Sequence, residues 1–432
     1  MKMNYNTHTL ANGLRIIHLP SAQPVVYCGY AVGAGTRDEE LGREEGMAHF
    51  CEHITFKGTE RRSSMQILGH LESVGGDLNA FTNKEETVYH AAVLKENIDR
   101  AVDLLTDIVF HSTYPQAEID KEVEVIVDEI ESYNDSPAEL VYDLFENAIF
   151  GGHPLGHNIL GTAEKLRRYT TADALRFTRR YYRPENSVFF AYGDVDFQKL
   201  VRLLERANAA DAAAESVAAV SLPPQQSAIS DNSCCGGGKD TAAALLPPYV
   251  AQHIEHHMDT HLAHVMLGTR AYDVHDERRI ALYLLNNILG GPGMTARLNV
   301  SLRERNALVY TVESMAQSYS DTGLWAVYFG CDPKNVKRCL RLIRRELDKV
   351  MQRPLSDAQL RAAKRQMRGQ IGIACDSRES FALDFAKSYL HYGWRKDVTA
   401  LCERIDALTA ADLQRVAQDL FAEERLTMLV IK

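Results

Sequence analysis

The sequence lacks any apolar run approaching the roughly 18 residues that a membrane span requires, so we expect no membrane-spanning helix. It also lacks a basic excess. With 48 Lys and Arg against 58 Asp and Glu, its formal charge of −10 argues against nucleic acid as a partner and weakly favours cationic peptides. The eight cysteines are scattered, which is typical of reduced thiols. The first residues show no apolar signal-peptide segment and instead predict a strand with an Asn-Gly turn. We therefore expect a cytoplasmic protein.

What the sequence does contain is a histidine pair with a glutamate between them, in "HFCEHITFKGT" (residues 49–59). On a helix, His49 and His53 lie one above the other on the same face and can hold one metal ion. Glu52 lies about 60° around the helix from His49. Its carboxylate can reach a water molecule on that metal without being a ligand. A catalytic zinc site needs three protein ligands, an open water position and a nearby base, so a third ligand is missing here.

A segment further along offers a carboxylate for that third position. Residues 120–137, "DKEVEVIVDEIESYNDSP", space their apolar residues as an amphipathic helix that ends in the turn residues Asn-Asp-Ser-Pro. Glu122 and Glu129 are seven residues apart and share one face of that helix. Glu124 and Glu131 are interpreted as its solvated face. A short histidine motif alone arises by chance often enough that this second segment has to decide the assignment.

Together these residues resemble the pitrilysin and insulin-degrading-enzyme family, the inverzincins, in which His-x-x-Glu-His is followed about 76 residues later by a glutamate. Counting 76 residues from His53 reaches Glu129. The resemblance implies that His49, His53 and Glu129 bind Zn²⁺ and that Glu52 is the catalytic base. In the family a further glutamate seven residues before the third ligand supports the site, and Glu122 occupies that position.

Two more segments extend the resemblance. Residues 75–90, "GGDLNAFTNKEETVYH", predict a turn and strands, and they resemble the family's strand that pairs with the substrate backbone. An exposed edge there could take an extended peptide as an additional strand; an ordinary hairpin is the alternative. The residues implied to bind substrate are Asn79, Ala80, Phe81 and Thr82.

Residues 289–314 are similar to the family's second signature, a Gly-rich turn and a helix followed by Arg and Tyr seven residues apart. Arg303 and Tyr310 match that pair. In the family the pair reaches the zinc site from a different domain and contacts the peptide and the developing oxyanion, where a donor can supply several kcal/mol. Without the resemblance, both would be interpreted as packing residues.

The chain length predicts two or three domains. Residues 1–206 and 249–432 each alternate strand-like and helix-like segments, whereas residues 207–248 are rich in Ala, Ser, Gly and Pro and predict a linker whose first part suits a short helix. The resemblance implies an α+β fold of two similar domains, each a mostly antiparallel sheet packed with helices, and only the first with metal. Members of the family of this length form half of a clam-shaped chamber, so the resemblance also implies a homodimer around a peptide.

Other metal-binding residues are weaker candidates. In "HIEHHMDTHLAH" (253–264), His253 and His257 would share one strand face, with His261 and His264 in the next strand, but no base or third ligand accompanies them. The pair Cys234–Cys235 has no ligand spacing. Cys51 faces away from the histidines and is expected in the core.

Two alternatives remain open at this point. The chain could be the catalytic subunit of an obligate heterodimer, like the mitochondrial processing peptidase, or a non-catalytic structural subunit. Structural subunits of the family usually lose zinc ligands, and here none is lost. The presence of the zinc motif and the Arg–Tyr pair in one chain favours a self-sufficient homodimer.

Overall fold

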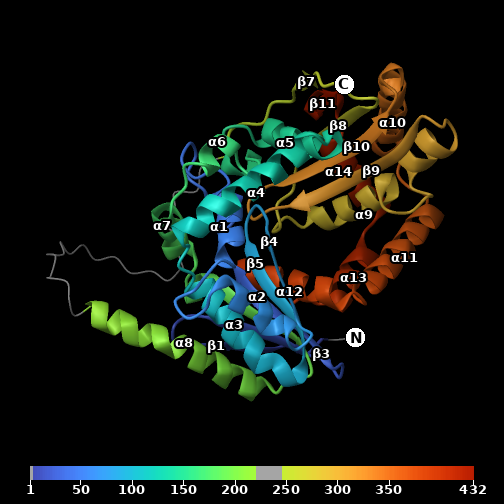
Figure 1. Cartoon of the computed structure of the whole chain (residues 1–432). Coiled ribbons are helices and arrows are strands. Elements are labelled where there is room, and N and C mark those ends of the chain that lie inside the picture. The colour runs from blue at the N-terminus through green and yellow to red at the C-terminus, as the bar shows by residue number, and fades with distance from the viewer. Residues whose placement is uncertain (1–2, 220–245) are drawn as a thin grey trace, which may run out of the picture.

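The computed structural model describes residues 3–219 and 246–432, which fold around two sheets (Figure 1). The strands of the first sheet are β1 (Asn6–Thr9), β2 (Arg15–Pro20), β3 (Val25–Val32), β4 (Asp77–Thr82), β5 (Thr87–Leu94) and β6 (Ser187–Gly193). Those of the second are β7 (His253–His256), β8 (Ala263–Ala271), β9 (Val309–Ser318), β10 (Gly323–Cys331) and β11 (Thr427–Ile431). The strand orders are β1-β2-β6-β3-β5-β4 and β7-β11-β8-β10-β9. Neighbours pair antiparallel except β2 with β6 and β7 with β11.

Helices pack on both sheets, which confirms the predicted α+β fold of two domains. In the N-terminal half (residues 3–219) they are α1 (Met47–Thr55), α2 (Ser64–Glu72), α3 (Ile98–Phe110), α4 (Gln116–Asn134), α5 (Pro137–Phe150), α6 (Ala163–Leu166), α7 (Thr171–Tyr181) and α8 (Phe197–Ala219). In the C-terminal half (residues 246–432) they are α9 (Arg278–Gly290), α10 (Val336–Gln352), α11 (Asp357–Ala374), α12 (Arg378–Tyr392), α13 (Val398–Ala407) and α14 (Ala410–Leu420). None of these helices has the length and apolar character that a bilayer crossing requires.

Short helical turns complete the described chain. They are the 3₁₀ turns η1 (Thr36–Asp38), η2 (Lys95–Asn97), η3 (Pro154–Gly156), η4 (Pro184–Asn186), η6 (Pro333–Asn335) and η7 (Glu423–Arg425), and the π-helical segment η5 (Asn299–Glu304).

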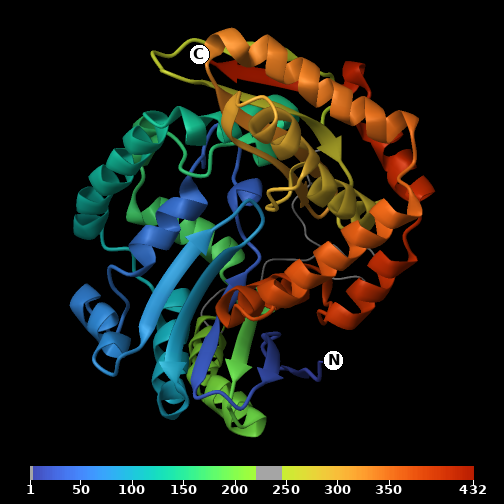
Figure 2. The same ribbon diagram turned by 90° about the vertical axis from the view of Figure 1, so that its right-hand side faces the viewer.

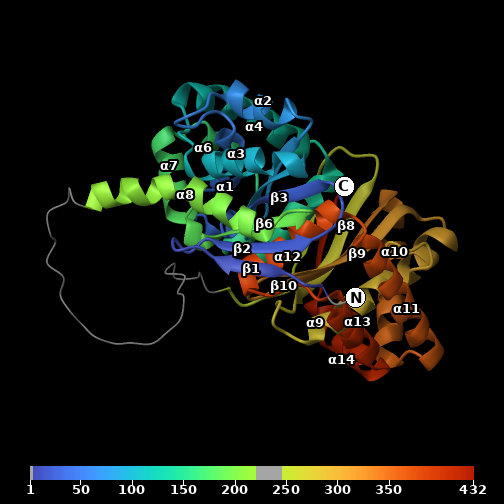
Figure 3. The same ribbon diagram turned by 90° about the horizontal axis from the view of Figure 1, so that it is seen from below.

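Each half contributes one helix to the sheet of the other half. Helix α5 packs on β8 and β11 through a buried row that includes Val141, Phe145 and Ile149. Helix α12 packs on β3 and β6 through Phe381 and Phe385. Figure 1 shows α5 beside the second sheet, and Figures 2 and 3 show α12, in orange-red, against the first. The two halves are therefore joined through shared apolar cores as well as through the chain.

Local sequence signals explain the elements that carry the site. Helix α4 buries Ile119, Val123 and Ile126 at helical spacing, and it ends at Asn134, where Ser136 and Pro137 begin the next helix. The Asn-Gly turn between β1 and β2 is confirmed, with Gly13 in the left-handed region at φ +88°.

The linker prediction can be compared with the structure only in part. The first part of the segment, residues 207–219, is helical as expected, but it is the end of the long helix α8 and not a separate short helix. Residues 220–245, including the pair Cys234–Cys235, lie outside the described residues.

Candidate metal centre

Helix α1 presents the two histidines because its other faces are buried. Met47, Phe50 and Ile54 are fully buried in the N-terminal core, as is Cys51, which confirms Cys51 as a core residue. The first turn of α1 is capped by Glu39, whose carboxylate accepts hydrogen bonds from the backbone N–H of Gly46 (3.0 Å) and of Ala48 (2.9 Å). The helix predicted to carry His49 and His53 is therefore present, and it is anchored in the N-terminal core.

Three side chains converge on one point between α1 and α4. Glu129 Oε2 lies 3.9 Å from His49 Nε2 and 3.5 Å from His53 Nε2, and one ligand atom from each residue lies within 4.8 Å of the others. Ligand atoms around a tetrahedral zinc ion are roughly 3.4 Å apart, given Zn–N and Zn–O distances near 2.1 Å. The residues present therefore fit zinc after small side-chain adjustments. They form the only such group of three among residues 3–219 and 246–432.

Glu122 supports the cluster from one side. Its Oε1 lies 3.2 Å from His53 Nδ1 and its Oε2 lies 2.6 Å from Lys57 Nζ. Contact with Nδ1 directs the opposite ring nitrogen, Nε2, toward Glu129, as metal-binding histidines require. Glu122 thus lies next to His53, where the family resemblance implies a supporting glutamate. Lys57 was not anticipated, although its place one helical turn after His53 was a usable signal.

The pKa shifts reflect this crowding. Burial and then the neighbouring His53 lower the pKa of His49 to about 4. Burial opposes protonation of His53 too, but its hydrogen bonds to Glu122 and Glu129 prevail and raise its pKa to about 9. The hydrogen bond with His53 lowers the pKa of Glu129. In the metal-free chain a proton on His53 therefore competes with a metal ion.

Glu52 lies beside the three converging residues, and its own hydrogen bond is with Thr82. Burial raises the pKa of its carboxyl, and the hydroxyl of Thr82, which donates to Glu52 Oε2 at 2.6 Å, counteracts that rise. A carboxylate with a raised pKa next to a metal position is chemically suited to accept and return a proton.

The predicted substrate strand β4 is one of the two edge strands of its sheet. A cleft of about 590 Å³ lies beside Glu52, and Asn79 and Ala80 line it. The other two residues are placed differently: Phe81 packs toward the cluster that includes α12, and Thr82 touches Glu52. The described structure thus brings three of the four strand residues to the site.

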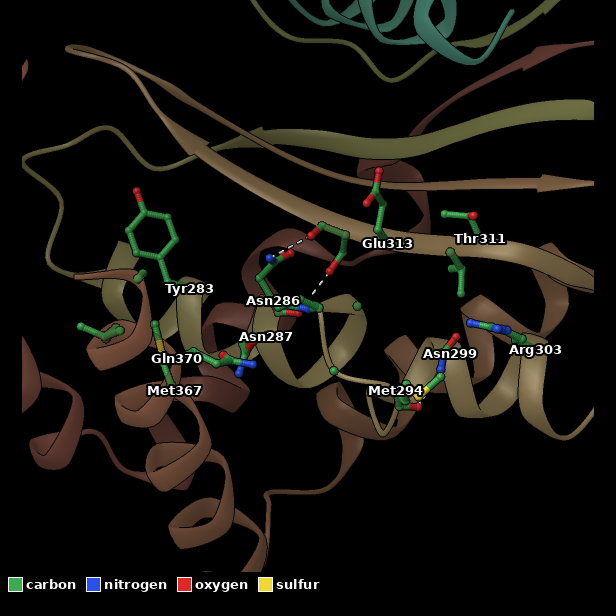
Figure 4. Close-up of a pocket in the computed structure, with 18 of the residues that line it drawn as sticks. Tyr283, Asn286, Asn287, Met294, Asn299, Arg303, Thr311, Glu313, Met367 and Gln370 are labelled. Carbon is green, nitrogen blue, oxygen red and sulfur yellow. Dashed lines mark hydrogen bonds between the residues drawn. The ribbon is translucent and has the colours of Figure 1, made fainter. Parts of the chain in front are cut away.

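Arg303 and Tyr310 lie in the other half of the chain. Arg303 is in η5, Tyr310 is 84% exposed near the start of β9, and the guanidinium carbon lies 5.6 Å from the centre of the tyrosine ring. Both line a cleft of about 640 Å³ whose lining residues lie within 283–314 and 367–374 (Figure 4). Figure 4 shows Arg303 at one end of this cleft, beside Asn299 and Thr311. No residue of the zinc cluster lines it.

The histidine-rich segment forms no centre in the described structure. His253 begins β7 and His264 lies in β8, where its Nδ1 is 2.9 Å from the hydroxyl of Tyr328. His257 and His261 lie between these strands, so their predicted placement within strands is wrong. β7 ends at His256, because pairing with β11 stops there.

The chain is similar to known zinc proteases. The family model described as Insulinase (Peptidase family M16) matches residues 16–163, and the model described as Peptidase M16 inactive domain matches residues 168–367. An uncharacterized zinc protease of Streptomyces coelicolor is 34% identical over 413 residues, covering 95% of this chain and 86% of that protein. The uncharacterized zinc protease YmxG of Bacillus subtilis is 32% identical over 428 residues, covering 98% and 97%. The crystal structure of a protease from Helicobacter pylori superposes with a TM-score of 0.85 at 23% identity over all of both chains, which shows the shared fold.

Proposed function

The chain belongs to the insulinase family of peptidases, M16, in its short two-domain form, and from that premise we propose that this zinc protease is an endopeptidase for unfolded peptides. The observation that carries the proposal is the convergence of His49, His53 and Glu129 on one point, with Glu52 beside it. A structural subunit would not need this set of donors. The complete set therefore favours catalysis.

In the proposed mechanism His49, His53 and Glu129 hold the zinc ion. The chemistry supplied by zinc in that position is Lewis acidity, which polarises the scissile carbonyl and lowers the pKa of a water molecule. Glu52 accepts a proton from the attacking water and passes it to the amine of the leaving product. Thr82 orients the Glu52 carboxylate through its hydrogen bond, and Glu122 holds the His53 ring.

The proposed substrate is an extended peptide added to the edge of β4. A free edge offers main-chain hydrogen bonds that are largely independent of side-chain identity. Asn79 and Ala80 line the cleft on that edge beside Glu52 and His53. This arrangement suits unfolded chains, because most backbone groups of a folded domain are already hydrogen-bonded within that domain.

We further propose that two chains pair as a homodimer and enclose a chamber, with Arg303 and Tyr310 of each chain serving the zinc site of the other. The strong exposure of Tyr310 and the separation of its cleft from the zinc cluster support action on a second chain. A heterodimer with a related subunit is the alternative. The proposed location is the cytoplasm, supported by the free thiols of all six cysteines in the described residues.

The test is hydrolysis of an internally quenched peptide by the purified chain, measured with zinc, with a chelator and after zinc is restored. We expect activity that the chelator removes and zinc restores. A matched pair of variants, Glu129→Gln and the exposed Glu131→Gln on the same helix, should separate ligand loss from charge loss. Zinc-loaded protein that cleaves no peptide, alone or with a related chain, would contradict the proposal.

A further inference from the structure

The turn between β4 and β5 carries three consecutive charged residues that are buried. Lys84 is 6% exposed, Glu85 5% and Glu86 1%. Hairpin turns normally lie at the surface, and burying an unpaired charge is costly. The surroundings of this turn therefore have to supply partners for all three charges.

Lys84 contacts the N-terminal half, and Glu85 contacts both halves of the chain. Lys84 Nζ lies 3.1 Å from Glu146 Oε2 on α5, the helix that packs on the second sheet, and it also donates to the backbone oxygen of His157. Glu85 accepts from the hydroxyl of Ser320 at 2.6 Å and from Arg37 at 2.9 Å. Ser320 lies in the turn between β9 and β10.

Glu86 contacts the helix that the C-terminal half contributes to the first sheet. Two residues of α12 are its partners. Lys387 Nζ lies 2.9 Å from Glu86 Oε1, and His391 Nε2 lies 2.9 Å from Glu86 Oε2. Although burial opposes ionisation, these two contacts lower the pKa of Glu86 to about 2. The charged form of Glu86 is thus the stable one in the fold.

Such buried ion pairs add little net stability compared with apolar packing, and their best-attested use is to define one arrangement among several. Here the buried charges bind one short turn to α5, to the β9–β10 turn and to α12, which are all far from it in the sequence. The backbone of the turn is also bound to η1, because the N–H groups of Thr36 and Arg37 donate to the carbonyl oxygens of Asn83 and Lys84 at 3.2 and 2.8 Å.

The residue directly before this turn is Thr82. Its hydroxyl donates to Glu52, and it ends the strand whose edge faces the cleft. A displacement of the turn is transmitted through the backbone to Thr82, which adjoins it. A shift of about 1 Å in a positioned group can reduce a rate by up to about 100-fold.

We propose that Lys84, Glu85 and Glu86 are positioning residues that hold Thr82 against Glu52, with Glu85 and Glu86 fastening the C-terminal half to the end of β4 and Lys84 fastening α5 to the same turn. The inference rests on the proposed function, in which Glu52 is the catalytic base. Residues of α12 and of the β9–β10 turn thus control the geometry of an active site that lies in the other half of the chain.

The experiment compares Glu86→Gln and Lys387→Met with Arg378→Gln. Arg378 lies at the other end of α12 and donates to the backbone oxygen of Val25, so its variant controls for weakened packing of α12. Hydrogen exchange of the amides of residues 77–82 should be faster in the first two variants and unchanged in the control. Lys387 is partly exposed, so its variant decides the matter if Glu86→Gln does not fold.

A second measurement tests the path through Thr82. Lys387→Met should lower kcat about tenfold at unchanged zinc content. In a Thr82→Val background the same substitution should lower kcat less than about twofold, because the effects of two substitutions along one path are not additive. Unchanged exchange in residues 77–82, or equal kcat losses in both backgrounds, would overturn the inference. If the wild-type chain cleaves no peptide, the proposed function fails, while the exchange measurement still decides whether the turn is fastened.

Discussion

Replacing Glu122 with glutamine keeps the size of the side chain but removes the charge that holds His53. Glu122 Oε1 lies 3.2 Å from His53 Nδ1, and Lys57 lies 2.6 Å from the other oxygen. Glu122 is not one of the three converging ligands. Removing a carboxylate that orients a ligating histidine lowers metal affinity about 10- to 100-fold, which corresponds to about 1.4 to 2.7 kcal/mol.

The assay is zinc competition with a chromophoric chelator at fixed pH, applied to Glu122→Gln, Glu129→Gln and Glu131→Gln. We expect a loss of about 10- to 100-fold for the first, a larger loss for the second because a ligand is removed, and no change for the third. Wild-type affinity in Glu122→Gln would refute the supporting role. A loss equal to that of Glu129→Gln would instead mean that Glu122 is itself a ligand.

The remaining predictions concern catalysis, assembly, substrate and pH. Glu52→Gln should retain zinc and lose at least about 100-fold in kcat, since a general base is removed; zinc loss equal to that of Glu129→Gln would show that Glu52 is a ligand. Mixing Glu52→Gln chains with Tyr310→Phe chains should restore roughly a quarter of wild-type activity, because half of the dimers are mixed and one of their two sites is intact; no recovery despite confirmed exchange would exclude action on the partner's site. Unfolded peptides should be cleaved while stable folded domains resist, and rapid internal cleavage of a folded domain would argue against an enclosed chamber. Zinc affinity should rise by up to about tenfold per pH unit toward pH 9, because the pKa of His53 is raised to about 9 in the metal-free chain and its proton must leave; constant affinity between pH 6.5 and 9 would contradict this.

Several features could be predicted from local sequence because they depend on local geometry. The spacing of His49, Glu52 and His53 places them on one side of a helix through the helical repeat alone, and the apolar pattern of residues 120–137 defines α4 in the same way. The position of Glu129 as third ligand came from a family spacing of 76 residues. No helical or strand period extends over such a distance, so residue patterns alone could not have identified it.

The sequence by itself determined the elements and the chemistry of their side chains, because hydrogen bonding within a helix and the alternation of a strand are set by residues near one another. Only the tertiary structure decided that β4 is an edge strand, that α5 and α12 are exchanged between the halves, and that Thr82 touches Glu52. A charged turn such as residues 84–86 would be expected at the surface, yet it is buried. The physical reason is that burial and strand order depend on contacts between segments hundreds of residues apart, and these form only when both halves pack together.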